Sequence, residues 1–190
     1  MSLENRDSLV ICICGKARSG KSLVGKYIYD YYVDNGYDVV FSPYTKYLKM
    51  YISEITGWDM TDKDKPRDLL QQLSSELIKK KLNRNDFFIN RQLEDIDIYS
   101  YFFDIIIIPD VRFPREIDVL KKKYNRVVSI GVIRNNYDSE LTDSQKNDVT
   151  ETALDNYGEY DYCIYNDDTD KLYSDTLEVV NKLRKKDSYE

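Results

Sequence analysis

The chain has 190 residues, of which 42% are hydrophobic and 33% are charged. That length is usual for one domain with a buried core, and the composition excludes a disordered segment. With 28 Lys and Arg against 34 Asp and Glu, the formal net charge of -6 excludes the broad positive field of a non-specific nucleic-acid binder. We therefore expect a single domain over residues 1–190 and no nucleic-acid partner.

The cysteines and the apolar runs indicate the compartment. Cys12, Cys14 and Cys163 are too few for a disulfide framework, and the chain has no histidine to complete a zinc site. We expect Cys12 and Cys14 to be small buried strand residues. No apolar run approaches the roughly 20 residues of a membrane span, and the acidic segment MSLENRD does not resemble a signal peptide. These features predict a cytoplasmic protein without membrane contact.

The predicted strands are five short apolar runs, each followed by a stretch of helical periodicity. This alternation is typical of crossover units in a parallel sheet, and nearly continuous apolar runs are typical of strands buried on both faces. The sequence therefore predicts an α/β fold with a five-stranded parallel sheet flanked by helices. The five runs span residues 8–14, 38–42, 103–109, 126–133 and 160–166.

The segment after the first run is GKARSGKS, which matches the P-loop pattern G-x-x-x-x-G-K-[ST]. An apolar strand precedes it and a helical stretch follows it, as the pattern requires. Glycines let backbone N–H groups curl around phosphate oxygens, and the helix amino end adds partial positive charge. We expect the phosphates of ATP to be bound by Gly15, Lys16, Ala17, Arg18, Ser19, Gly20, Lys21, Ser22 and Leu23.

Two P-loop side chains have expected roles of their own. Lys21 would reach the β- and γ-phosphates as a point charge, and the Ser22 hydroxyl would bind Mg²⁺. The loop therefore predicts a nucleotide-binding protein that uses ATP and magnesium.

A long helical insertion is predicted between the second and third runs, over residues 43–100. Helical stretches span residues 46–55, 66–82 and 85–96, with Leu69, Leu73 and Leu77 at a spacing of four. This is more helix than a simple crossover needs. Insertions in such sheets commonly cover the carboxyl edge, where ligands bind, so we expect this one on the side of the phosphoryl acceptor.

Asp110 follows the third run and begins the segment DVRFPRE. A carboxylate at the tip of a buried strand beside a P-loop usually holds magnesium or its water, which is the role we expect here. The alternative is an exposed aspartate that caps the next helix. Arg112 and Arg115 could clamp phosphate oxygens, although for Arg115 an ion pair with Glu116 or Asp118 is an equal alternative.

Two further segments are predicted after the fourth run. Residues 134–149 are polar and are expected to form a lid, with Arg134 and Lys146 as candidates to swing over the substrates. The alternative is that both are solvated charges. The last helix is expected to pack on the sheet through Tyr173, Leu177, Val180 and Leu183.

At this point the chain resembles the bacteriophage-type deoxynucleoside monophosphate kinases, a branch of the P-loop small-molecule kinases. Four segments carry the likeness and span almost the whole chain, and DVRFPRE is the most specific of them. The segments are the P-loop, residues 65–77 (KPRDLLQQLSSEL), residues 110–116 (DVRFPRE), and residues 132–134 (VIR) followed by residues 148–151 (DVTE).

The resemblance implies phosphoryl transfer from ATP, with magnesium, to a deoxynucleoside monophosphate. It implies that Arg112 and Asp110 face the reacting phosphates, that Arg67 and Gln71 lie beside the acceptor, and that Arg134 opens the lid. Asp148 stands where histidine is frequent in the family, and Ser-Ser at positions 74 and 75 stands where Gly-Thr is frequent. These departures leave the identity of the acceptor open.

The expected site combines the residue patterns with the resemblance. The catalytic group comprises Lys21, Asp110, Arg112 and Arg134. The metal would be held by Ser22 and Asp110. The acceptor side comprises Lys49, Arg67, Gln71, Arg112 and Arg115.

Two other functions remain as alternatives. One is a P-loop kinase for another small molecule, such as dephospho-coenzyme A or a nucleoside, because only the acceptor pocket separates these enzymes. The other is a nucleotide-dependent switch or ATPase with a protein partner. The absence of an Asn-Lys-x-Asp segment and the presence of the insertion favour a kinase over a switch. The expected partners are small nucleotides, and a homodimer is left open.

Overall fold

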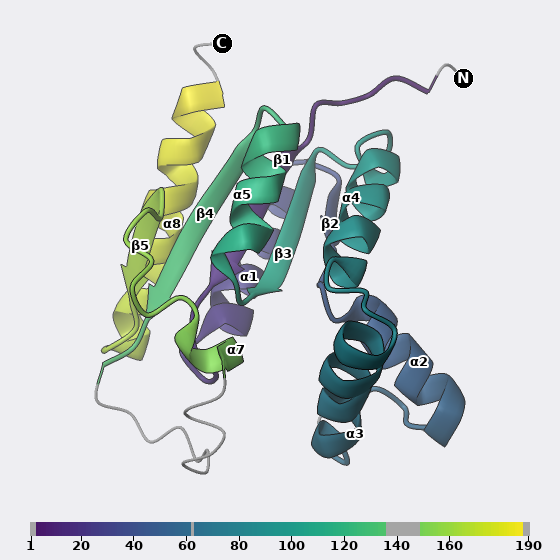
Figure 1. The fold of residues 1–190 in the computed structure, drawn as a ribbon. Coiled ribbons are helices and arrows are strands. Elements are labelled where there is room, and N and C mark those ends of the chain that lie inside the picture. Colours follow the sequence, from purple (N-terminus) through teal and green to yellow (C-terminus); the bar gives the residue numbers. More distant parts are fainter. Residues whose placement is uncertain (1–2, 62, 136–148, 188–190) are drawn as a thin grey trace.

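The computed structural model describes residues 3–61, 63–135 and 149–187, and it centres on a five-stranded sheet (Figure 1). The strands lie in the order β2-β3-β1-β4-β5, and every pairing is parallel. The predicted α/β fold with a five-stranded parallel sheet is therefore confirmed. The strands are β1 (Leu9–Cys14), β2 (Val39–Phe41), β3 (Ile105–Val111), β4 (Val127–Ile133) and β5 (Tyr162–Tyr165).

Helices cover both faces of the sheet (Figure 1). The helices α1 (Lys21–Asp34) and α8 (Thr169–Asp187) share one hydrophobic core with it. On the opposite face, α4 (Phe87–Tyr99) and α5 (Pro114–Lys123) share a second core. This two-sided cover explains why the central strands are apolar along their whole length.

Burial differs between the central and the edge strands. All six residues of β1 are buried, including Cys12 and Cys14, as predicted. In β5, by contrast, Ile164 is buried while Cys163 and Tyr165 are exposed. The expectation of burial on both faces is thus wrong for β5, because an edge strand has a neighbour on one side only.

An irregularity interrupts the pairing of β1 with β3. Cys12 pairs with Ile108, but Cys14 pairs with Val111, so β3 carries one extra residue between the two pairs. This is a β-bulge, and it changes which face the following residues occupy. Ile108 and Val111 consequently belong to the same core, although an odd number of positions separates them.

The insertion consists of four helical segments that pack around a small core of their own, formed by Leu48, Ile52, Trp58 and Leu70. The segments are α2 (Lys46–Thr56), α3 (Arg67–Gln71), η1 (Gln72–Lys81) and α4 (Phe87–Tyr99). They lie within the predicted range 43–100. In Figure 1, α2 and α3 project beyond the carboxyl ends of β2 and β3.

The regular helix predicted over residues 66–82 is only partly correct, because η1 is a π-helix. A π-helix pairs each residue with the fifth along the chain rather than the fourth. The apolar face therefore continues from Leu73 to Ile78, which is buried, whereas Leu77 is 40% exposed. A spacing of four in the sequence does not reveal this change of period.

The last helix packs on the sheet through a face close to the predicted one. Leu183 and Val180 are buried as expected, but Leu172 occupies the core position expected for Tyr173, which is 50% exposed. Tyr173 instead places its ring edge-on to Tyr27, with the centroids 4.9 Å apart. Within the described residues, no helix combines the length and the apolar character that a membrane crossing requires.

Candidate functional site

The P-loop lies between β1 and α1 and is shaped by two glycines with positive φ. Gly15 has a φ of 141°, and a Cβ there would lie 2.4 Å from the Val132 carbonyl oxygen. Gly20 has a φ of 105°, and a Cβ there would lie 2.4 Å from Nδ2 of Asn166. Both glycines are therefore required by the backbone and by close neighbours. We call residues 15–22, with the ends of β1, β3 and β4, the P-loop corner.

Asn166, which follows β5, holds this corner in place through two hydrogen bonds. Its side-chain amide donates to the Ser19 carbonyl oxygen at 2.9 Å, and its backbone N–H donates to the Ile133 carbonyl oxygen at 2.7 Å. Ser19 is buried, and its hydroxyl has no hydrogen-bond partner among the described residues. A buried orphan hydroxyl and a glycine-lined loop fit a site that takes a polar group such as a phosphate.

Lys21 opens α1 from a buried position, with its residue 8% exposed. Its ammonium donates to the carbonyl oxygen of Lys16, in the same loop. Burial and the nearby Arg112 cation lower the pKa of Lys21 from 10.5 to about 7, against the opposing carboxylates of Glu151 and Asp110. An anionic ligand in the loop would relieve this buried positive charge.

Asp110 lies within β3 and holds the start of the insertion. Its Oδ1 accepts the backbone N–H of Tyr44 at 2.8 Å. Its Oδ2 accepts the backbone N–H of Thr45 at 3.1 Å and the Thr45 hydroxyl at 2.7 Å. The alternative that Asp110 caps α5 is wrong, because Glu116 accepts the Arg112 and Phe113 N–H groups at that end, at 2.7 and 3.1 Å.

Ser22 and Asp110 carry oxygen atoms of the kind that Mg²⁺ prefers. Ser22 is exposed at the start of α1, and Asp110 is half-buried on β3, where both of its carboxylate oxygens accept hydrogen bonds from Tyr44 and Thr45. Among residues 3–61, 63–135 and 149–187, no cluster of three or more Cys, Asp or Glu side chains could hold a metal alone. A magnesium ion here would therefore also depend on phosphate oxygens.

Glu116 is buried beneath the turn that follows β3. Burial raises its pKa from 4.5 to about 7, although its two bonds from backbone N–H groups favour the charged form. The ammonium of Lys79 lies 4.9 Å from the ring centroid of Phe113, which leads into the same turn. Sequence reasoning missed Lys79, because its place beside the turn depends on the π-helical path of η1.

Arg112 and Arg115 have different surroundings. The Arg112 guanidinium donates to Oε1 of Glu151 at 2.6 Å, with the two side chains 27% and 12% exposed. Arg115 points away from the P-loop corner and pairs with Asp86 at 2.7 Å, where both side chains are exposed. The predicted ion pair of Arg115 thus exists, but its partner is neither Glu116 nor Asp118.

Glu151 is another residue of the candidate site that sequence reasoning did not single out. It lies on α7 (Val149–Thr152), and its Oε2 accepts the backbone N–H of Ala17 at 2.7 Å. Its segment is also tied to the loop by an ion pair of 2.8 Å between Lys16 and Asp155. DVTE belongs to one of the segments that carry the family resemblance, so a signal was present, but the partners of Glu151 depend on the fold.

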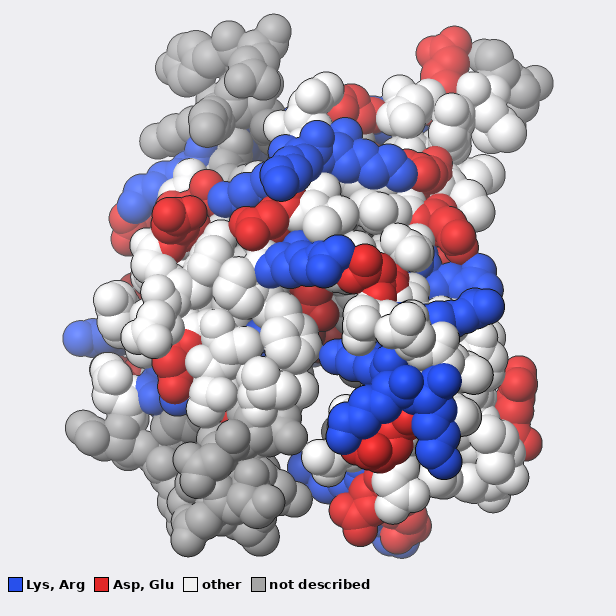
Figure 2. All heavy atoms as spheres, viewed as in Figure 1, with Lys and Arg blue, Asp and Glu red and all other residues white. Residues whose placement is uncertain are grey.

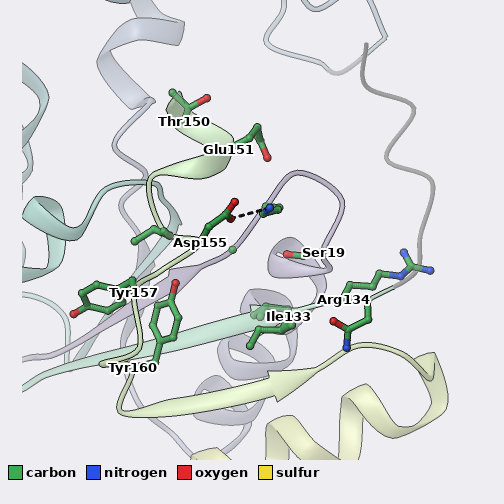
Figure 3. Close-up of a pocket in the computed structure, with 13 residues that line it drawn as sticks. Ser19, Ile133, Arg134, Thr150, Glu151, Asp155, Tyr157 and Tyr160 are labelled. Carbon is green, nitrogen blue, oxygen red and sulfur yellow. Dashed lines mark ion pairs between the residues drawn. The ribbon is translucent and has the colours of Figure 1, made fainter. Parts of the chain in front are cut away.

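A cavity of about 380 Å³ lies between the P-loop, the end of β4 and α7 (Figure 3). Figure 3 shows Glu151 and Asp155 beside the loop, the rings of Tyr157 and Tyr160 on one side, and Arg134 on the other. Arg134 is exposed and reaches the Arg18 carbonyl oxygen at 3.5 Å. Most of the predicted lid, residues 134–149, lies outside the described residues, and Lys146 lies outside them too.

Apart from Arg112, the predicted acceptor residues lie on several different helices. Arg67 and Gln71 are exposed on α3, Lys49 is half-buried on α2, and Arg115 pairs with α4. In the described part of the chain, none of them lines the cavity beside the P-loop. Figure 2 shows a hollow between the α7 side and the inserted helices, with Lys and Arg atoms along the insertion.

Comparisons with known proteins place the fold. No family model matches the chain, and no curated protein matches it. Among solved structures, it is similar to the APS kinase CysC of Mycobacterium tuberculosis in complex with AMPPNP and APS. The TM-score is 0.59 at 11% identity, over 93% of this chain and 98% of that chain.

Two shikimate kinases also match. That of Aquifex aeolicus has a TM-score of 0.49 at 13% identity, over 92% of this chain and 97% of that chain. That of Bacteroides thetaiotaomicron has a TM-score of 0.49 at 12% identity, over 93% and 98%. This chain, with its P-loop after the central strand, therefore has an α/β fold similar to that of the solved APS kinase.

Proposed function

We propose that this protein is a kinase that transfers the γ-phosphoryl group of ATP, with magnesium, to a deoxynucleoside or ribonucleoside monophosphate. The observation that carries the proposal is the P-loop corner, where the buried Lys21 and the half-buried Arg112 converge on a glycine-lined loop. Two cations beside a phosphate-binding loop are the arrangement that stabilises charge on a phosphoryl group in transfer.

The proposed donor is ATP. The pattern GKARSGKS supports it, as does the fold, since the solved APS kinase of the same fold is in complex with AMPPNP. Ser22 and Asp110 would hold the magnesium ion, which would neutralise charge on the phosphate oxygens. Lys21 would then leave the Lys16 carbonyl oxygen and take a phosphate oxygen instead.

The proposed acceptor is a nucleoside monophosphate. The support is the resemblance of DVRFPRE and of residues 65–77 to the phage-type kinases, together with an insertion beside the carboxyl ends of β2 and β3. An acceptor phosphate is already ionised near neutral pH, so the transfer needs positioning and charge neutralisation rather than a strong general base. Arg112 is the residue best placed to contact the phosphate that moves.

The test is an ADP-release assay with ATP, Mg²⁺ and a panel of ribo- and deoxyribonucleoside monophosphates, with nucleosides and dephospho-coenzyme A as further acceptors. We expect at least one monophosphate to give turnover well above ATP hydrolysis alone. The Lys21→Met variant, purified in parallel, controls for contaminating kinases. Turnover with only a nucleoside or dephospho-coenzyme A would replace the acceptor class, and triphosphate binding without transfer to any acceptor would contradict a kinase.

A further inference from the structure

Glu151 joins two parts of the candidate site that lie far apart in the sequence. It contacts Ala17, 134 positions away, through one carboxylate oxygen, and Arg112, 39 positions away, through the other. The first contact is on the P-loop between β1 and α1, and the second follows β3. One side chain thus sets the distance between the loop that would bind the donor and the cation that would meet the transferred group.

The two contacts have the features of strong interactions. Both are short, at 2.7 Å from the Ala17 nitrogen and 2.6 Å from the Arg112 guanidinium, and both involve a charged group. The Glu151 side chain is 12% exposed and that of Arg112 is 27% exposed, so water competes weakly for them. An ion pair exposed to water would contribute little to stability, but this pair is largely shielded from water.

Arg112 needs such a contact if it is to act on a phosphate. An arginine has several rotatable bonds, and holding its guanidinium in one place costs side-chain entropy. The backbone N–H of Arg112 is fixed by Glu116, but that bond leaves the long side chain free to rotate. Glu151 is the residue that fixes the guanidinium itself against the P-loop.

We propose that Glu151 is a positioning residue, which holds the Arg112 guanidinium beside the P-loop so that it meets the phosphoryl group in transfer. The inference rests on the proposed function. Glu151 does not itself contact the substrates in this role, and it acts through Arg112. Its bond to Ala17 is the anchor that transmits the geometry of the loop to the arginine.

Glu151→Gln is the informative substitution, because it replaces one of the two accepting oxygens by an NH2 group, which cannot accept from Ala17 or Arg112. We expect kcat to fall on the order of 10²-fold, as a misplaced catalytic group can cause. The dissociation constant for ATP, measured by calorimetry, should change less than about 3-fold, since the P-loop keeps its glycines and Lys21. The melting temperature shows whether the variant folds.

A double-mutant cycle with Arg112→Ala separates positioning from a general structural role. If Glu151 acts through Arg112, adding Glu151→Gln to Arg112→Ala should lower kcat no more than about 2-fold further. Independent, multiplying effects on kcat would overturn the inference. So would tighter ATP binding with higher kcat in Glu151→Gln, because the carboxylate would then be an obstacle in the loop.

Asp155→Asn is the matched control. Asp155 ties the same segment to the same loop through Lys16 but does not contact Arg112. Its effect on kcat should therefore multiply with that of Arg112→Ala rather than vanish in the cycle. A cycle in which both carboxylates couple equally to Arg112 would assign the effect to the segment as a whole and would reject a specific role for Glu151.

A measurement without substrates completes the design. The order parameter of the Arg112 side-chain Nε, assigned by comparison with Arg112→Lys, should fall clearly below the wild-type value in Glu151→Gln and stay at that value in Asp155→Asn. A rigid Arg112 in Glu151→Gln would contradict the inference even if the wild type is an active kinase. If the wild type transfers phosphate to no acceptor while Arg112 loosens as expected, the proposed function fails and Glu151 keeps a structural hold on Arg112 only.

Discussion

The P-loop corner and the inserted helices lie on either side of Asp110. The two regions differ in how many buried neighbours hold their residues in place. The corner is continuous with the two large cores of the sheet, and its glycines, Lys21 and Ser19 are held by buried neighbours. The insertion has a small core of four buried residues, a π-helix, and exposed polar side chains where the acceptor was expected.

This difference between a firmly held corner and a loosely held insertion suits two different tasks in a kinase. Binding a triphosphate requires backbone N–H groups in fixed positions, which a rigid loop on a buried strand provides. Choosing and enclosing a second substrate requires surfaces that can move, and segments with few buried contacts open at lower free-energy cost. Under the proposed function, the corner would be organised in advance for phosphate, and we expect the insertion to become organised when the acceptor binds.

The largest effect should come from Lys21→Met, at the centre of the corner. We expect transfer to fall by about 10⁴-fold, because the buried cation beside the γ-phosphate is lost. The melting temperature near pH 6 should stay the same or rise, since the lowered pKa of Lys21 means that burying its charge costs folding free energy there. Activity close to wild type, or a large loss of stability, would break the view of the corner as organised for phosphate.

Arg112 and Arg115, the two arginines of DVRFPRE, test whether the difference between the P-loop corner and the insertion also appears within one short segment. Arg112→Ala should lower kcat by about 10³-fold, because it removes a cation from the transferred group, and it should also lower the melting temperature, because Glu151 loses its ion-pair partner. Arg115→Ala should change kcat less than about 3-fold, because its ion pair with Asp86 is exposed. Steady-state rates with the best acceptor and thermal melts check both, and the reverse order of effects would exchange their roles.

The buried carboxylate of Glu116 gives the corner a dependence on pH. Its folded pKa of about 7 lies above the unfolded value of 4.5, so the folded state binds more protons between these limits, and the free energy of unfolding falls as pH rises from 4.5 to 7. Relative to Glu116→Gln, the wild type should lose up to about 3 kcal/mol over this window. Urea unfolding of both proteins at several pH values measures the difference, and parallel curves would show that Glu116 is ionised throughout.

A smaller effect than that of Lys21→Met or Arg112→Ala should come from the insertion. Arg67→Ala and Gln71→Ala, on the exposed face of α3, should raise KM for the acceptor by about 10-fold and leave KM for ATP within about 2-fold. Under the proposed function, each would remove one contact that forms only when the insertion closes on the acceptor. Equal effects on both substrates would erase the functional distinction between the two regions, and no effect would remove these residues from the acceptor site.

The sequence predicts the frame of the molecule well and its tertiary contacts poorly. Central strands such as β1 are apolar without interruption, and the P-loop is a local pattern between a strand and a helix, so both could be read from neighbouring residues. Glu151 could not be assigned a partner, because Ala17 and Arg112 reach it only through the order of the strands. The contacts of Asp110 with Tyr44 and Thr45 were hidden for the same reason.

The other source of error was the helical period, which decides which residues of a helix face the core. The leucines at positions 69, 73 and 77 fit an α-helix, but the chain widens into a π-helix and buries Ile78 in place of Leu77. In α8, the buried face is rotated by one residue, from Tyr173 to Leu172. The roles of Lys49, Arg67, Gln71 and Arg134 stay predictions, since each depends on a bound substrate.

The bulge in β3 decides which way the segment DVRFPRE emerges from the sheet. If β3 had the same number of residues but alternated regularly, Val111 would turn toward α1 instead of joining Ile108 on the other face. The direction in which Arg112 leaves the sheet thus depends on the bulge in β3 as much as on the identity of any side chain.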